Sequence, residues 1–329
     1  MIKRLFFALT GITLFCLFWY LQAVRPVTLH SFPEIEVEIA SGESVDQIAN
    51  KLSNLKLIRS RTAFKFTVIR LGLASKIQAG FFKLSPNEST VIIANKLTKA
   101  STKQTRVTLP EGLRRHEMAL IIHKALLKSN PETTFSVDEF IKQTTSLEGQ
   151  LFPDTYDLDP KTDTQTVISR LTDTHKRALA DLKVPVEKQK EIIIIASLLE
   201  REAGDASEMK EIAGVISNRL KAGWPLQIDA TVQYIIATNR CKKADCDWWP
   251  VSITKQDLQI KSPFNTYANP GLPPAPISNP GKDSLSAALS PASTPFWFYL
   301  HDAQGVIHFA KTVEEHNQNV CLYLKKDCR

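Results

Sequence analysis

I-I-I-I-A-S-L-L at residues 192–199 is followed directly by Glu200, Arg201 and Glu202. Nearly every position of this run is apolar, and a helix that is apolar on all sides is a buried one. Burial raises the pKa of a carboxyl group at the end of such a helix, which keeps a proton available near neutral pH, as a general acid requires. The stretch therefore predicts a fold built around this helix, with Glu200 as a catalytic acid. The alternative is a solvated glutamate paired with Arg201 or Lys210.

A second helix is predicted over residues 208–222, ended by Gly223 with Pro225 just beyond. Gly214 lies in its middle, where glycine costs about 1 kcal/mol relative to alanine. We therefore expect another segment to approach this face of the helix closely. Asn218 lies four residues further along on the same face and is predicted to contact substrate there.

Three blocks of sequence resemble the endolytic murein transglycosylase (YceG-like) family. They are S-L-L-E-R-E-A at 197–203, I-A-G-V-I-S-N-R-L-K-A-G-W-P-L-Q-I-D-A-T-V-Q-Y at 212–234, and S-P-F-N-T-Y with G-L-P-P-A-P-I-S-N-P-G at 262–267 and 271–281. The resemblance runs from about residue 36 to residue 320. It implies a lyase that cuts the glycan strands of peptidoglycan, with its catalytic glutamate at Glu200. Ala230 and Ala275 depart from the family pattern, which bears on substrate fit rather than on the acid.

The resemblance also implies a mechanism with one carboxyl group. Glu200 protonates the oxygen between N-acetylmuramic acid and N-acetylglucosamine, and then accepts the proton of the muramic C6 hydroxyl as a 1,6-anhydro ring closes. A hydrolase instead uses a second carboxylate, about 5 Å away for retention or about 6.5 to 9.5 Å away for inversion. A lysozyme-like hydrolase using Asp205 or Glu148 stays open as an alternative. A non-catalytic wall-binding scaffold is the other.

Several polar residues are predicted to contact the sugar: Asn218, Gln227, Tyr234, Asn265 and Tyr267. Asn265 and Tyr267 lie in a Pro-rich loop, and loops on a firm scaffold concentrate ligand contacts. A turn-making role is the alternative for both. Asp229 and Asn279 are predicted to cap the helices that follow them. Trp248 and Trp249 either stack on a saccharide or anchor their loop.

The composition indicates the kind of partner. The chain has 329 residues, of which 43% are hydrophobic and 23% are charged, so it can bury a sizeable core in two folded regions. A net charge of +7 favours an acidic partner. Because no basic block is interleaved with aromatic residues, as a nucleic-acid groove requires, we expect peptidoglycan or an anionic membrane surface and no nucleic acid. Peptidoglycan synthases are partners by resemblance only, and no cofactor is expected.

The amino-terminal stretch predicts a membrane anchor. Residues 5–24 are uncharged and mostly apolar, and about 20 such residues can span a bilayer as a helix. Lys3 and Arg4 precede the stretch while only Arg25 follows closely, so the amino end is predicted to be cytoplasmic and the remainder periplasmic. This gives a single-pass protein of the inner membrane. A cleaved signal peptide is the alternative, although residues 19–21 fit a cleavage site badly.

Cysteine usage agrees with an oxidising compartment. Cys16 lies in the apolar stretch, which leaves an even number of cysteines outside it. Of three possible connectivities we predict the local disulfides Cys241 with Cys246 and Cys321 with Cys328. Zinc is the alternative for four cysteines, but two C-x-x-C pairs are lacking and no histidine stands beside them, so no metal site is expected.

An internal repeat organises the region after the anchor. Residues 43–52 and 88–97 both read E-S-x-x-x-I-A-N-K-L, and each copy predicts a strand end, a serine cap and a short amphipathic helix. The region is similar to the LysM-like region of the family, and it either binds glycan or forms a packing platform. The predicted fold class is α+β: a transmembrane helix at residues 1–30, a LysM-like α/β repeat region at 31–104, and a larger α+β catalytic domain with a buried central helix at 105–329.

Overall fold

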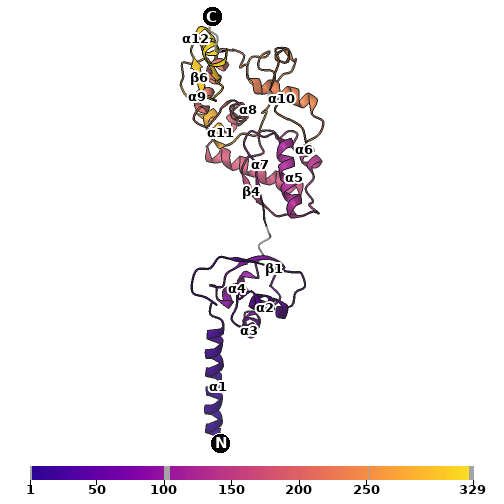
Figure 1. The fold of residues 1–329 in the computed structure, drawn as a ribbon, viewed down its shortest axis with the longest axis vertical. Helices are drawn as coiled ribbons and strands as arrows, with labels where there is room; N and C mark the ends of the chain where they lie inside the picture. Colours follow the sequence, from indigo (N-terminus) through magenta and orange to yellow (C-terminus); the bar gives the residue numbers. More distant parts are fainter. Residues whose placement is uncertain (1, 100–103, 251, 326–329) are drawn as a thin grey trace. The chain divides into compact units, whose positions relative to one another are not determined.

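The computed structural model describes residues 2–99, 104–250 and 252–325, with the side chains of the first helix from residue 10 onward. The chain divides into two units, residues 1–104 and 105–329. Each unit has a hydrophobic core of its own. Figure 1 labels the elements of both units along the chain.

The first unit pairs two short strands with three short helices after an initial long one. Its elements are α1 (Ile2–Ala23), β1 (Ile35–Ile39), α2 (Val45–Asn54), α3 (Arg61–Arg70), β2 (Gly80–Leu84) and α4 (Thr90–Lys96). β1 and β2 pair in antiparallel fashion. Ser44 caps α2 and Ser89 caps α4, each accepting a backbone N–H at 3.3 Å. The predicted repeat of strand, serine cap and helix is therefore confirmed, whereas its LysM-like classification stays a prediction.

The predicted transmembrane helix is wrong. In the described part of the chain, no helix combines the length and the apolar character needed to cross a bilayer. Thr10 and Gly11 interrupt the apolar run of α1, and its last turn packs on α3: the Tyr20 hydroxyl lies 2.9 Å from Thr67 Oγ1, and the Tyr20 ring meets Phe66 edge-on at 5.2 Å between centroids. Tyr20, which packs within the unit, was counted in the sequence as part of the membrane span. The structure therefore does not support the predicted single-pass anchor in the inner membrane.

The second unit has the α+β composition predicted for it. Its elements are β3 (Thr105–Thr108), α5 (Arg115–Ser129), α6 (Val137–Gln143), β4 (Thr155–Leu158), α7 (Thr164–Asp181), α8 (Gln189–Glu202), α9 (Met209–Lys221), α10 (Asp229–Arg240), α11 (Lys282–Leu289), β5 (Phe298–His301), β6 (Ile307–Ala310) and α12 (Val313–Asn319), with short 3-10 turns at Val186–Lys188 and Asp257–Gln259 and a π turn at Val320–Lys325. β3 pairs with β4, and β5 pairs with β6, both antiparallel.

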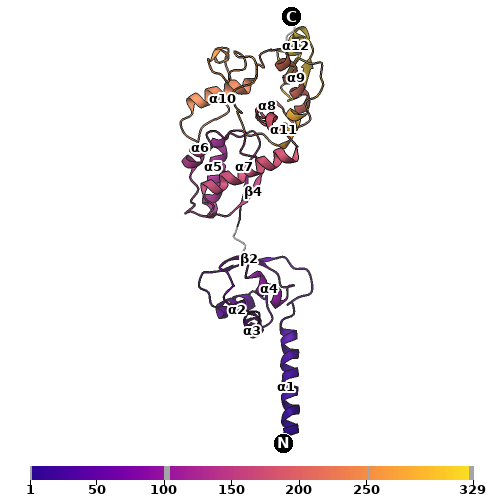
Figure 2. The ribbon, with the colours of Figure 1, turned by 180° about the vertical axis from the view of Figure 1, so that it is seen from behind.

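α8 is the centre of the second unit. Every residue from 192 to 199 is at most 8% exposed. α9, α10 and α11 pack around it, and Figure 2, like Figure 1, places α8 between α10 on one side and α9 with α11 on the other. Met209 and Ile212 of α9 and Leu285 of α11 join its core. The helix without a polar stripe is thus buried, as its sequence predicted, and its last turn emerges among these neighbours.

Gly214 lies where the segment before β5 crosses α9. A Cβ on Gly214 would lie 2.5 Å from the carbonyl oxygen of Ala292 and 2.7 Å from Cγ2 of Thr294. The expectation that another segment approaches this face is therefore confirmed. The contact fixes the β5–β6 end of the unit against α9.

Gly214→Ala is expected to lower the free energy of unfolding by about 1 kcal/mol, the middle of the net range. A clash with a backbone carbonyl costs about 1–3 kcal/mol, while alanine recovers about 1 kcal/mol of helix propensity. Urea denaturation measures the difference. Ser217→Ala in the same helix is the control and should be neutral or slightly stabilising. A Gly214→Ala protein as stable as the wild type would contradict the crowded contact.

Candidate active site

Glu200 lies in the last turn of α8, directly after the buried run, and its side chain is half-buried. Its Oε2 accepts a hydrogen bond of 3.0 Å from the backbone N–H of Gly281. Gly281 is the N-cap residue of α11, so the carboxyl group meets the positive end of a helix dipole. The group is thus held by backbone at a defined place.

The loop that carries Gly281 is fastened to α8 by one serine. The N–H of Ile277 donates to Ser197 Oγ at 3.1 Å, and the hydroxyl of Ser278 donates to the Ser197 carbonyl at 3.0 Å. Ser197 and Ser278 are both fully buried. Ser197 stands about one turn before Glu200, so the loop is tied to the helix close to the candidate acid.

A second carboxyl group, that of Glu111, lies against the same glycine. A Cβ on Gly281 would lie 1.8 Å from Glu111 Oε1. Any residue other than glycine at position 281 would therefore displace the Glu111 carboxyl group. Although much of Glu111 is exposed, partial burial of its carboxyl end raises the pKa of Glu111, and the negative charges of Glu200 and Asp283 raise it further. Glu111 and Glu200 therefore form a pair of carboxyl groups that meet at one residue.

Sequence reasoning missed Glu111, because Glu111-Gly112 reads as a turn that leads into α5. The sequence feature that could have indicated Glu111 is the glycine that follows it, Gly112. Gly112 has a φ of +76°, and a Cβ there would lie 3.3 Å from Glu200 Cγ. The side chain of Glu200 thus runs between two glycines, Gly112 and Gly281.

Asn279 is a buried hydrogen-bonding centre and not the helix cap that was predicted, since α11 begins at Lys282. Its Oδ1 accepts the N–H groups of Gly149 and Leu151 at 2.8 and 3.0 Å, and its Nδ2 donates to the Leu113 carbonyl and to Glu148 Oε1 at 3.0 and 2.9 Å. The capping prediction was wrong because these partners come from distant segments. One amide therefore holds three loops together beside the candidate acid.

The two carboxylates considered for a hydrolase, Glu148 and Asp205, have local structural partners. Glu148 is 6% exposed and pairs with Arg115, with Oε2 at 3.0 Å from Nη1; burial raises the pKa of Glu148. Asp205 is exposed, and its hydrogen bonds from the hydroxyl and N–H of Ser207 lower the pKa of Asp205. Both groups stabilise loops, whereas the carboxyl group beside Glu200 is that of Glu111.

A cavity of about 570 Å³ opens beside the last turn of α8, within the usual range of ligand sites of about 300–1,000 Å³. Arg201, Gln227 and Tyr267 are among its lining residues. Two of the predicted sugar contacts, Gln227 and Tyr267, are therefore brought together next to the residue that follows Glu200. The Tyr267 hydroxyl donates to Asp229 at 2.5 Å. The predicted cap role of Asp229 was wrong: it is the first residue of α10, and no side-chain cap is formed there.

Glu202 is one of the titratable groups that line this cavity. Its side chain is half-buried, and its Oε2 accepts the Tyr299 hydroxyl at 2.8 Å. Burial raises the pKa of Glu202 to about 7, and the hydrogen bond from Tyr299 acts in the opposite direction. Glu202 therefore changes its charge near neutral pH.

Glu202→Gln is expected to unfold like the wild type at pH 4 and to be more stable by about 2 to 3 kcal/mol at pH 8. The folded-state pKa lies above the ordinary value of 4.5, so the stability that protonated Glu202 contributes is full below that value and is lost as the pH rises through 7. Urea denaturation at both pH values measures this. Glu191→Gln, at an exposed site of the same helix, is the control. An equal difference from the wild type at both pH values would contradict the raised pKa.

Tyr234, another predicted sugar contact, lies in a different cavity. This one has a volume of about 540 Å³ and is also lined by Glu148 and Phe264. The guanidinium of Arg114 lies 4.0 Å from the centroid of the Tyr234 ring. The structure therefore does not bring Tyr234 into the cavity that holds Gln227 and Tyr267.

The amides of Asn218 and Asn265 are occupied by backbone carbonyls. Asn218 donates to Thr294 and Phe296 at 2.9 and 3.0 Å, and the fully buried Asn265 donates to Leu258 and Ile260 at 3.0 and 2.9 Å. Asn265 thus has the turn-making role that was the alternative prediction. Asn218 holds the segment that crosses α9 in place. A role in sugar binding stays a prediction for both.

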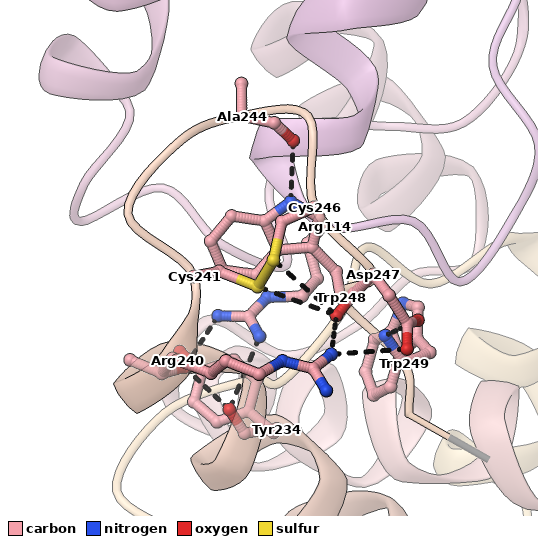
Figure 3. Close-up of a disulfide and its surroundings, with 10 residues drawn as sticks. Arg114, Tyr234, Arg240, Cys241, Ala244, Cys246, Asp247, Trp248 and Trp249 are labelled. Carbon is pink, nitrogen blue, oxygen red and sulfur yellow. Dashed lines mark hydrogen bonds and ion pairs between the residues drawn. A yellow bond between two sulfur atoms is a disulfide. The ribbon is translucent and has the colours of Figure 1, made fainter.

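A disulfide joins Cys241 and Cys246 after α10, the local pair expected from the sequence (Figure 3). Of the other expected pair, Cys328 lies outside the described residues. In the described ranges, no group of His, Cys, Asp or Glu is placed to hold a metal ion.

The two tryptophans beyond the disulfide anchor their loop on charged side chains, and Figure 3 shows Trp248 beside Arg114. Trp248 is 4% exposed, donates to the Ala244 carbonyl at 2.8 Å, and packs 4.5 Å from the Arg114 guanidinium. Trp249 donates to Glu117 at 3.1 Å, and the Arg201 guanidinium lies 4.0 Å over its ring. Trp248 therefore anchors its loop. Trp249 connects this loop to Arg201, the residue that follows Glu200.

Comparison with known proteins identifies the family of most of the chain. Residues 37–321 match the YceG-like family. The chain is 33% identical over 324 residues to the endolytic murein transglycosylase of Bacillus subtilis (strain 168), covering 90% of this chain and 86% of that protein. It is 25% identical over 342 residues to the endolytic murein transglycosylase of Streptococcus pneumoniae serotype 2 (strain D39 / NCTC 7466), covering 92% of this chain but only 60% of that protein.

A solved structure agrees with these relatives. The crystal structure of a yceG-like protein, lmo1499, from Listeria monocytogenes aligns with a TM-score of 0.52 at 30% sequence identity, over 88% of this chain and 99% of that one. The match to the family covers both units and includes Glu111, Glu200 and Gly281. The chain therefore belongs to the YceG-like family.

Proposed function

We propose that the protein is a lytic transglycosylase of murein that cuts glycan strands internally, the activity stated in the names of its B. subtilis and S. pneumoniae relatives. Its substrate is the bond between N-acetylmuramic acid and N-acetylglucosamine, and its place of action is the cell envelope, where murein lies. One observation carries the proposal: the carboxyl group of Glu200, at the end of the buried helix α8, is held by the backbone N–H of Gly281.

Glu200 acts first as an acid and then as a base. It gives its proton to the glycosidic oxygen, so that N-acetylglucosamine leaves as positive charge develops on the muramic ring. The resulting carboxylate is stabilised by the N–H of Gly281, since hydrogen bonds to the charged form favour it. It then takes the proton of the muramic C6 hydroxyl, whose oxygen bonds to C1 and closes the 1,6-anhydro ring. No water is consumed.

The polar cavity beside α8 supports a place for the sugar. Gln227 and Tyr267 line it and are proposed to hydrogen-bond the glycan, with Arg201 between them and the acid along the chain. Tyr234 would contact a glycan strand only if that strand extends into the other cavity, which Glu148 and Phe264 also line. Glycan binding by the first unit and contact with peptidoglycan synthases stay predictions.

A hydrolase is the second candidate, and Glu111 favours it. Its carboxyl group and that of Glu200 both lie against Gly281, and hydrolases that retain configuration place two carboxyl groups about 5 Å apart. The names of the B. subtilis and S. pneumoniae relatives state a transglycosylase, which favours the first candidate.

Mass spectrometry of the products from purified glycan strands separates the candidates. Anhydro-muramyl ends support the transglycosylase, and ends heavier by one water support the hydrolase. Intact strands after incubation with the folded wild-type protein would reject both and leave a wall-binding scaffold.

A further inference from the structure

We propose that Trp224, together with Trp297 and Phe298, forms an aromatic platform on which a sugar ring of the glycan strand stacks, at the rim of the cavity that holds Gln227 and Tyr267. The inference rests on the proposed function and extends it. It assigns a second saccharide subsite, outside the cavity, to a surface for which the mechanism has no use.

Trp224 is the exposed tryptophan of the second unit. Its side chain is 45% exposed, whereas Trp248 is buried and Trp249 and Trp297 are half-buried. A single exposed apolar residue is common on a protein surface and needs no explanation. Trp224 is not single, because its ring centroid lies 4.8 Å from that of Trp297 and 6.3 Å from that of Phe298. The three rings form one cluster, and Trp224 is the part of it that solvent reaches most.

The end of α9 fixes the position of Trp224. The N–H of Trp224 donates to the Arg219 carbonyl at 2.9 Å, and the N–H of Gly223 donates to the Leu220 carbonyl at 3.1 Å. With Gly223 at a φ of +69°, this is a Schellman ending, in which the residue after the glycine often packs back on an apolar residue of the last turns. The residue in that place is Arg219, so the Trp224 ring packs on Trp297 instead.

Arg219 joins the two segments that carry the platform. Its side chain is 8% exposed. Its Nη1 donates to the Leu226 carbonyl at 2.5 Å, and its Nε donates to the Trp297 carbonyl at 2.8 Å. Because Leu226 closely follows Trp224, one buried guanidinium holds both aromatic segments in place. A surface that is ordered before the ligand arrives loses less conformational entropy on binding.

The platform borders the cavity to which the proposed function assigns the sugar. Phe298 and Arg219 line that cavity together with Gln227 and Tyr267. A cavity of about 570 Å³ holds a short piece of a polymer, and a strand that is cut internally continues beyond the cut bond, so it must cross the rim. A hexopyranose ring presents a face of C–H groups, which complements the apolar, electron-rich face of an indole ring. A sugar of the same strand is therefore the occupant that fits Trp224.

The test is the binding of an octasaccharide of alternating N-acetylglucosamine and N-acetylmuramic acid to the full chain, measured by isothermal titration calorimetry. Glu200→Gln is the parent protein, so that the sugar stays intact. Adding Trp224→Leu keeps apolar volume against Trp297 but removes the flat ring, and it should raise the Kd about five- to tenfold. Trp224→Phe keeps an aromatic ring and should stay within about threefold of the parent.

Leu127→Ala is the matched control, because Leu127 of α5 is 44% exposed and lines neither this cavity nor the platform; it should leave the Kd within about twofold. Equal Kd values for Trp224→Leu and the parent overturn the inference, as does an octasaccharide that the parent does not bind. A loss that Trp224→Phe shares in full overturns it too, since the flat ring would then not be the binding group.

NMR of the indole N–H groups gives a second measurement that does not depend on how Trp224→Leu folds. The Trp224 signal, assigned by its absence from Trp224→Phe, should shift when octasaccharide is added to the parent, while that of the buried Trp248 should not. A Trp224 signal that stays in place overturns the inference. Neither measurement requires cleavage, so a wild-type protein that binds the octasaccharide at Trp224 and leaves glycan strands intact would reject the proposed function alone.

Discussion

Glu200→Gln is expected to lower the rate at which anhydro-muramyl ends are released by about 10²- to 10⁴-fold, the contribution typical of general acid–base catalysis. Glutamine is close in size to glutamate, and its amide oxygen can still accept the N–H of Gly281 that Glu200 now accepts. It cannot give a proton to the glycosidic oxygen or take one from the C6 hydroxyl. The loss should therefore appear in kcat, with little change in the temperature of unfolding.

The matched control for this loss is Glu191→Gln. Glu191 belongs to the first turn of the same helix and is exposed, so its replacement makes the same chemical change away from the site and should leave the rate within about twofold, in line with the small effects of surface substitutions. Equal release of anhydro ends by wild type and Glu200→Gln would remove Glu200 from the mechanism. A large loss of stability in Glu200→Gln would show that the carboxyl group serves the fold first.

Asn279→Ala is expected to lower the free energy of unfolding by about 4 kcal/mol or more. The Asn279 side chain is fully buried and bonds four groups: two backbone N–H groups, one backbone carbonyl and the carboxylate of Glu148. Each buried polar group that loses its partner costs about 1–3 kcal/mol. The alanine also leaves the loops of Glu111, Glu148 and Gly281 without their common bond, so activity should fall together with stability.

Urea denaturation at constant pH measures this loss. Asn269→Ala is its control, because Asn269 also donates to two backbone carbonyls, at 2.9 Å each, but is exposed. Water replaces those bonds, and a cost below about 1 kcal/mol is expected there. If Asn279→Ala costs no more than Asn269→Ala, the network around Asn279 is not a determinant of stability.

The parts of the fold that sequence reasoning predicted are those encoded by neighbouring residues. The apolar run at 192–199 has no polar stripe, and burial of α8 follows from that alone. The repeat at 43–52 and 88–97 carries its own serine caps and short helices. Gly214 indicated a close contact because a glycine in mid-helix has a known energetic cost.

The parts that failed depend on partners far along the chain. Asp229 and Asn279 were both predicted to be helix caps. In the structure Asp229 accepts a hydrogen bond from Tyr267, and Asn279 forms hydrogen bonds with loops up to 166 residues away. Glu111 carried no chemical pattern of its own, because the carboxyl pair exists only once Gly281 lies beside it. The membrane helix was predicted from the composition of the apolar stretch of α1 alone. Composition does not reveal that Tyr20 packs within the unit.

The meeting of Glu111, Glu200 and Gly281 has a consequence for biosynthesis. These residues come from three segments separated by about 80 to 90 positions, and the last of them directly precedes α11. A ribosome-bound or truncated chain that lacks this segment has its acid without the backbone that holds it. We therefore expect premature termination or proteolytic cleavage before Gly281 to abolish the activity.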